Sequence, residues 1–125
     1  MANLRVLLVE DDEDNRELMA EVLAASGCDV VSAATGREAL DKLAEARVDV
    51  LVTDVGMPGM GGLEVAKAAK AMAPDVAVVV VTGWAEREDI ASARGKDVDA
   101  VLIKPVEPDV LTQAVTEVAR SAAPT

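Results

Sequence analysis

Two kinds of apolar segment alternate along this chain, and this alternation limits the possible folds more than any other feature. Short continuous runs of Val, Leu and Ile are typical of strands that are buried on both faces of a sheet. The run Asp29–Ala33 is more polar and is expected to form a strand at an edge. The four continuous runs are Leu4–Val9, Val48–Thr53, Val76–Val81 and Val98–Ile103.

Segments with helical spacing follow each of these runs. The first is expected to end at Gly27, and the second to begin with a capping box formed by Thr35 and Glu38. The other three are predicted from Gly62 to Met72, over Ala85–Arg94, and after Pro108, a residue suited to a first helical turn. The residues expected to face the core are Leu18, Met19, Val22 and Leu23, then Ala39, Leu40 and Leu43, then Leu63, Val65, Ala66 and Ala69, and finally Val110, Leu111, Ala114, Val115 and Val118.

This order of strand and helix predicts an α/β fold in which helices cover both faces of a parallel sheet. Residues 1–125 contain no repeat or linker, and a chain of this length can bury a core of its own. We therefore expect a single domain.

Composition excludes several classes of function. The net charge of −11 argues against direct binding to nucleic acid, which needs clustered Lys and Arg. The absence of histidine excludes Ser-His-Asp catalysis and histidine metal ligands. With Cys28 as the single cysteine, no internal disulfide can form, and no apolar stretch is long enough for a membrane helix. These features predict a cytoplasmic protein without membrane contact.

Polar residues that could carry chemistry follow the predicted strands. Glu10 and Asp11 come after the first and Asp54 after the third, while the fourth ends with Thr82-Gly83 and the fifth with Lys104-Pro105. Ligands of open parallel sheets bind beyond the carboxyl ends of the strands. Carboxylates gathered there repel one another and need a cation, and oxygen ligands alone favour Mg²⁺. With a lysine and a hydroxyl beside it, such a site suits phosphoryl transfer to a carboxylate.

Four motifs at these strand ends give the chain a resemblance to the receiver domain of two-component response regulators. They are Val9-Glu10-Asp11, Thr53-Asp54 with Met57-Pro58-Gly59-Met60, Thr82-Gly83, and Lys104-Pro105. The resemblance covers nearly the whole chain and implies a flavodoxin-like fold, with five parallel strands in the order 2-1-3-4-5.

The resemblance also implies a role for each site residue. The chain would accept a phosphoryl group from the phosphohistidine of a histidine kinase or phosphotransfer protein, and would then act on an unknown protein target. Slow self-dephosphorylation would follow, and the region formed by the fourth and fifth strands and the helix after each would change conformation. The implied roles are phosphoacceptor for Asp54, Mg²⁺ ligands for Glu10, Asp11, Asp54 and the backbone carbonyl of Gly56, switching hydroxyl for Thr82, and phosphoryl-pairing ammonium for Lys104.

The chain also departs from the family pattern. Val101 and Val106 replace common aromatic residues, which puts the aromatic version of the switch in doubt, and Gly61 stands where many members have Asp. Trp84 is the only aromatic residue and is open to either a packing or a functional role. The segments around Gly56 and Thr82 resemble receivers attached to hybrid histidine kinases.

Two other classes of function remain open. A pseudo-receiver would keep the fold as a binding module without the chemistry, but it would be favoured only if Asp54, Asp11 or Lys104 were missing. A Mg²⁺-dependent aspartyl-phosphate phosphohydrolase usually has a second Asp two residues after its nucleophile, where this chain has Gly56.

Overall fold

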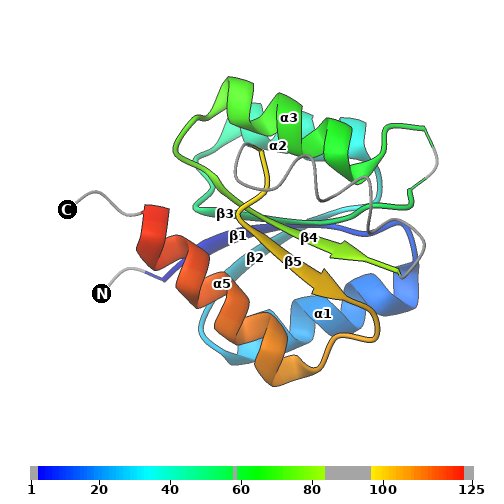
Figure 1. The fold of residues 1–125 in the computed structure, drawn as a ribbon, viewed down its shortest axis with the longest axis vertical. Coiled ribbons are helices and arrows are strands. Elements are labelled where there is room, and N and C mark those ends of the chain that lie inside the picture. Colours follow the sequence, from blue (N-terminus) through cyan, green and yellow to red (C-terminus); the bar gives the residue numbers. More distant parts are fainter. Residues whose placement is uncertain (1–2, 58, 84–96, 123–125) are drawn as a thin grey trace.

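Five parallel strands form one sheet in the order β2-β1-β3-β4-β5 in the computed structural model, which describes residues 3–57, 59–83 and 97–122 (Figure 1). This is the flavodoxin-like strand order that the resemblance to receiver domains implies. β2 lies at an edge of the sheet, as its polar sequence indicates. The strands are β1 (Arg5–Val9), β2 (Asp29–Ala33), β3 (Val50–Asp54), β4 (Ala77–Thr82) and β5 (Ala100–Ile103).

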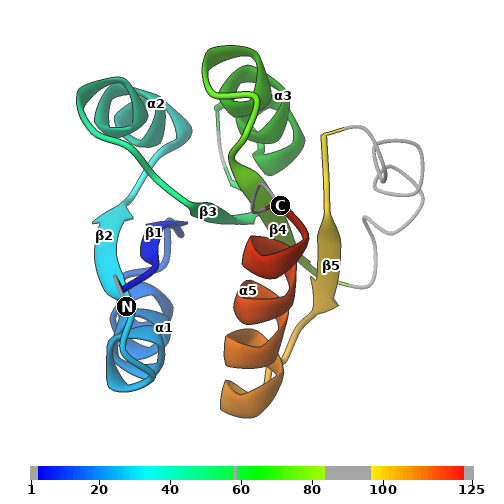
Figure 2. The same ribbon diagram turned by 90° about the vertical axis from the view of Figure 1, so that its left-hand side faces the viewer.

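Helices cover both faces of the sheet, as expected. Figure 2 shows α2 (Gly36–Glu45) and α3 (Gly62–Met72) on one side, and α1 (Glu13–Ala25) and α5 (Pro108–Ala122) on the other. The helix predicted over Ala85–Arg94 lies outside the described residues. No helix in the described part of the chain has both the length and the apolar character that a bilayer span requires.

The sheet divides the apolar core into two layers. Alternate side chains of a strand point to opposite faces, so Leu7 and Leu51 pack under α2 and α3, whereas Leu8 and Val52 pack against α1 and α5. All residues of β3 and β4 are buried. The three central strands are therefore held from both sides.

The predicted helix ends are confirmed with one difference. Gly27 follows the end of α1 with φ +98°, a conformation that favours glycine. Thr35 caps α2, since its Oγ1 accepts the backbone N–H of Glu38 at 3.1 Å. The Glu38 carboxylate accepts the N–H of Ala34 at 2.8 Å, one residue before the Thr35 N–H of a standard capping box.

Two side chains that we expected to face the core are exposed, so these predictions are wrong. Leu18 is 59% exposed and Val110 is 45% exposed. Both lie at the margin of an apolar stripe whose centre is buried, as Met19 and Leu23 show in α1. Helical spacing predicts the stripe, but the partner elements decide how much of its width is covered.

The strand bounds and the burial of the last strand also differ from expectation. β3 ends at Asp54, a residue that was expected to follow this strand, whereas β4 ends at Thr82 as expected. β5 is an edge strand whose residues are only partly buried, with Ile103 39% exposed. Within the described residues β5 has a neighbouring strand on one side only, and its side chains are less enclosed than those of β3 and β4.

Candidate functional site

The carboxyl ends of four neighbouring strands bring the predicted site residues to one edge of the sheet. Glu10 directly follows β1, Asp54 ends β3, Thr82 ends β4 and Lys104 directly follows β5. These strands are adjacent in the order β1-β3-β4-β5, so the register of the sheet places their ends side by side. The convergence expected from the sequence is therefore present.

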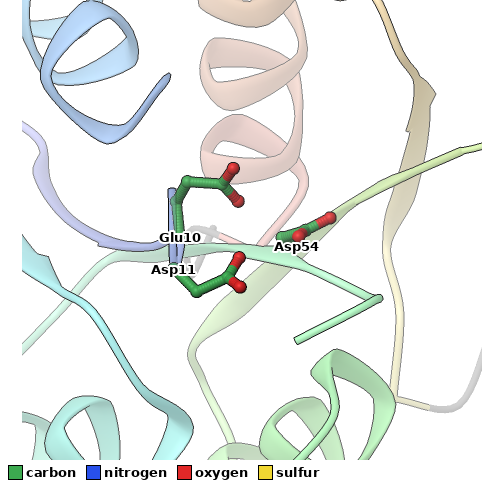
Figure 3. A group of neighbouring side chains, drawn as sticks. All are labelled: Glu10, Asp11 and Asp54. Carbon is green, nitrogen blue, oxygen red and sulfur yellow. The ribbon is translucent and has the colours of Figure 1, made fainter. Parts of the chain in front are cut away.

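Three carboxylates face one another at this edge. Glu10, Asp11 and Asp54 each offer an oxygen that lies within 4.8 Å of those of the other two (Figure 3). Glu10 is 2% exposed and Asp54 is 7% exposed, whereas Asp11 is exposed. Two acids with little access to water and a third beside them form an oxygen-only set that fits a hard cation such as Mg²⁺.

Lys104 supplies positive charge to this group. Its Nζ lies 2.9 Å from Oδ1 of Asp54 and 3.9 Å from Oε1 of Glu10. Burial lowers the pKa of Lys104, but the hydrogen bond and charge of Asp54, helped by the charges of Glu10 and Asp11, outweigh burial and raise this pKa above its ordinary value. The side chain is thus an ammonium at neutral pH. The peptide bond between Lys104 and Pro105 is cis.

The surroundings of Glu10 disfavour its ionised form. Burial is the main cause that raises the pKa of Glu10 above its ordinary value, and the neighbouring charge of Asp54 adds to it. A hydrogen bond from Asn15 and the charge of Lys104 act in the opposite direction without cancelling the rise. A bound divalent cation would favour the ionised carboxylate.

Asn15 and Arg16, two residues of α1, contact Glu10 and were missed in the sequence analysis. Nδ2 of Asn15 donates to Oε1 of Glu10 at 2.8 Å, and Nη1 of Arg16 donates to the Glu10 carbonyl at 2.9 Å. Asn15 and Arg16 belong to the first turn of α1, which begins three residues after Glu10. This closeness in sequence could have indicated that both residues lie near the site. Spacing alone does not show which way the side chains point.

Thr82 lies at the same edge and is fully buried. Its Oγ1 donates to the carbonyl of Gly83 at 2.9 Å, and its own carbonyl accepts the backbone N–H of Lys104 at 2.9 Å. The hydroxyl residue and the lysine are thus joined through the backbone of adjacent strands.

The loop after β3 contains Gly56, which is exposed and stands two residues past Asp54. The metal-binding role of its carbonyl stays a prediction. Gly62, at the start of α3, approaches the backbone of Asp54 so closely that a Cβ atom there would collide with the Asp54 carbonyl oxygen. The position of the end of β3 therefore depends on a glycine at residue 62. Pro58 and Trp84 lie outside the described residues.

Comparisons with known proteins agree with this geometry. The family model described as the response regulator receiver domain matches residues 6–116. The chain therefore belongs to the receiver domain family of two-component response regulators, whose members are regulatory phosphoacceptor domains.

Named relatives support the same assignment. Sporulation initiation phosphotransferase F of Bacillus subtilis (strain 168) is 30% identical over 92% of this chain and 93% of its own length. The chemotaxis response regulator CheY4 of Vibrio cholerae superposes with a TM-score of 0.87 at 32% identity, covering 94% of this chain and 99% of that one.

Other relatives are longer than this chain. A response regulator receiver protein of Anaeromyxobacter sp. (strain Fw109-5) is 38% identical over 82% of this chain, which spans 43% of that protein. A cyclic di-GMP phosphodiesterase of Thermotoga maritima is 37% identical over 94% of this chain, which spans 32% of it. The match in these proteins thus concerns less than half of their length.

Proposed function

We propose that this chain is a phosphorylatable receiver in a two-component phosphorelay, with Asp54 as the acceptor. The observation that carries the proposal is the surroundings of Asp54, whose Oδ1 lies 2.9 Å from the Lys104 ammonium while the carboxylates of Glu10 and Asp11 stand within 4.8 Å. A nucleophilic carboxylate, a fixed cation and a metal-binding acid pair are the parts that phosphoryl transfer to an aspartate requires. We further propose that residues 1–125 form one receiver domain.

The transfer step follows from the chemistry of the donor. A partner histidine kinase or phosphotransfer protein presents a phosphohistidine, since this chain has no histidine of its own. A carboxylate oxygen of Asp54 attacks the phosphorus atom, the P–N bond breaks, and the imidazole nitrogen leaves with the electron pair. The product is an aspartyl phosphate, which water later hydrolyses in a slow self-dephosphorylation.

Glu10, Asp11, Asp54 and the Gly56 carbonyl would hold Mg²⁺, which when bound neutralises negative charge on the acids and on the phosphoryl oxygens. Lys104 pairs with the phosphoryl group and keeps it against Asp54. The long stem of Glu10 lets its carboxylate reach the group from the end of β1. The acids that repel one another in the free protein therefore become the ligand set of the reaction.

Thr82 would move toward the phosphoryl group once Asp54 is modified. Its carbonyl is bonded to the N–H of Lys104, so a shift of this residue acts directly on the chain that follows β5. Phosphorylation changes the local charge, and a neighbouring element with two conformations converts this change into a different binding surface. The recipient is a downstream protein target.

The proposal is tested by incubating the protein with acetyl phosphate and Mg²⁺ and measuring the intact mass. We expect one added phosphoryl group in the wild type and none in Asp54→Ala. Asp41→Ala, which removes an exposed acid of α2, serves as the matched control and should be labelled like the wild type. Equal labelling of Asp54→Ala and wild type would reject Asp54, and no labelling of either would favour a pseudo-receiver.

A further inference from the structure

The first turn of α1 holds Glu10 at two atoms. Asn15 donates its side-chain N–H to Oε1 at 2.8 Å, and Arg16 donates to the main-chain carbonyl at 2.9 Å. One contact fixes the carboxylate and the other fixes the backbone from which it extends. Glu10 is thus oriented by a neighbouring helix and not only by the strand that it follows.

Asn15 is itself fixed by the cap of the helix. Its backbone N–H donates to Oδ2 of Asp12 at 3.1 Å, and the N–H of Arg16 donates to the Asp12 carbonyl at 2.8 Å. Asp12 has the extended conformation of an N-cap residue, with φ −79° and ψ 118°. The side-chain amide of Asn15 therefore projects from a turn whose geometry is already set.

The neutral amide of Asn15 affects the Glu10 carboxylate differently from the charged ammonium of Lys104. Glu10 has one more rotatable bond than Asp would have, so its carboxylate needs an external contact to stay in one orientation. Lys104 also approaches Oε1, at 3.9 Å, but its charge competes with a metal cation for the same carboxylate. The amide of Asn15 orients the oxygen while leaving the full negative charge to a cation.

We propose that Asn15 is a positioning residue for the magnesium site, which holds the Glu10 carboxylate toward Asp11 and Asp54 and thereby sets the affinity for the ion. The inference rests on the proposed function, because it concerns the same site. It adds a residue from outside the acidic trio and the strand ends, and it explains how the longer acid at position 10 can serve there.

The test is a calorimetric titration of Mg²⁺ into the wild type, Asn15→Ala and Gln113→Ala. Gln113 is the matched control, since on α5 its amide donates to the Glu117 carboxylate at 3.2 Å, away from the site. Loss of a group that orients a metal ligand costs on the order of 10-fold in affinity, so we expect Asn15→Ala to raise the Kd for Mg²⁺ by roughly 10-fold. Gln113→Ala should leave the Kd unchanged. Alanine is the best helix former, so Asn15→Ala is expected to fold.

A double-mutant cycle separates positioning from a general structural effect. In a Glu10→Ala background, Asn15→Ala should cause no further change in the Kd for Mg²⁺, because the carboxylate that it orients is gone. In acetyl phosphate labelling, Asn15→Ala should raise the half-saturating Mg²⁺ concentration by roughly 10-fold and leave the rate at saturating Mg²⁺ within about twofold. The same loss of affinity in both backgrounds would overturn the inference.

The outcomes also distinguish this inference from the proposed function. If the wild type and Asn15→Ala bind Mg²⁺ equally well, the positioning role is wrong, while phosphorylation of Asp54 stands. If the wild type binds no Mg²⁺ and its labelling does not depend on the ion, both the metal site and the positioning role are wrong. Weaker binding by Asn15→Ala with unchanged binding by Gln113→Ala supports the inference.

Discussion

The two ends of the parallel sheet use acidic residues in opposite ways. At the amino end, Asp49 accepts the backbone N–H of Arg5 at 2.9 Å and lies 3.8 Å from Nε of Arg47. Asp99 accepts the N–H of Val78 at 2.8 Å and the ammonium of Lys70 at 2.9 Å. Each of these acids thus has a backbone donor and a basic partner.

At the carboxyl end, three carboxylates lie together, and the ion pairs that the described residues make to them come from Lys104 alone. Burial is the main cause that raises the pKa of Glu10 above its ordinary value there, and the neighbouring charge of Asp54 adds to the rise. The same residue type thus stabilises the fold at one end, while at the other it forms a group of carboxylates that repel one another and that the proposed Mg²⁺ would join.

The largest effect is expected from Gly62→Ala. The added Cβ would collide with the Asp54 carbonyl, and overpacking of this kind costs up to about 3 kcal/mol. Urea unfolding should show this loss, and labelling by acetyl phosphate should slow because Asp54 is displaced. Gly61→Ala is the control, since its Cβ would meet the Val55 carbonyl at 3.4 Å and should cost under about 1 kcal/mol. Equal stability of the two variants would contradict the close approach at residue 62.

Asp99→Ala should give the next largest effect. The substitution leaves the buried N–H of Val78 without its acceptor and removes one partner of Lys70, so we expect a loss of about 2 kcal/mol in unfolding free energy. Asp11→Ala, measured without Mg²⁺, should leave stability unchanged or raise it, because it relieves repulsion. Comparable destabilisation by both substitutions would remove the contrast between the two ends.

Mg²⁺ should stabilise the wild type by mass action. At a free concentration ten times the Kd, the gain in unfolding free energy is about 1.4 kcal/mol. Thermal melting with and without Mg²⁺ measures this gain, which should vanish in Asp11→Ala and persist in Asp99→Ala. A gain that survives in Asp11→Ala would place the ion elsewhere.

The smallest effect concerns Glu38, a paired acid near the carboxyl end. The hydrogen bond from the Ala34 amide is the main cause that holds the pKa of Glu38 below its ordinary value, and Lys42 adds to it. An acid with a lowered folded pKa contributes stability above its unfolded value of 4.5 and loses it as the pH falls through the folded value.

Glu38→Gln should therefore cost up to about 0.5 kcal/mol at neutral pH, a small amount because the side chain is 44% exposed. The difference from the wild type should shrink as the pH falls below 4.5. Urea unfolding of both proteins at neutral pH and at low pH measures this difference in unfolding free energy. If the difference in unfolding free energy grew as the pH fell, the pKa of Glu38 would not be lowered in the folded protein.

Much of this structure could be predicted, because local sequence patterns determine the strands and the topology of a parallel sheet determines where their ends meet. Continuous Val and Leu runs specify central strands, and parallel strands place their carboxyl ends together, which brought Asp54 to Glu10 and Lys104. Burial in β5 was predicted wrongly, since the sequence of a strand does not show whether a neighbour lies on each side. Leu18 was misplaced for a related reason, because helical spacing does not fix the width of the covered face. Asn15 was missed since a helix pattern says nothing of side-chain direction at its first turn.

The two apolar layers of the core also determine where the proposed phosphorylation of Asp54 can have an effect. Displacing β3 or β4 would disturb packing above and below the sheet at once, so the platform that carries Asp54 is stiff. Among the described residues, β5 has a neighbouring strand on one side only and its side chains are only partly buried, and the N–H of Lys104 after it is bonded to the Thr82 carbonyl. The response to a modified aspartate should therefore travel sideways through the sheet, from strand to strand, and emerge at its β5 margin.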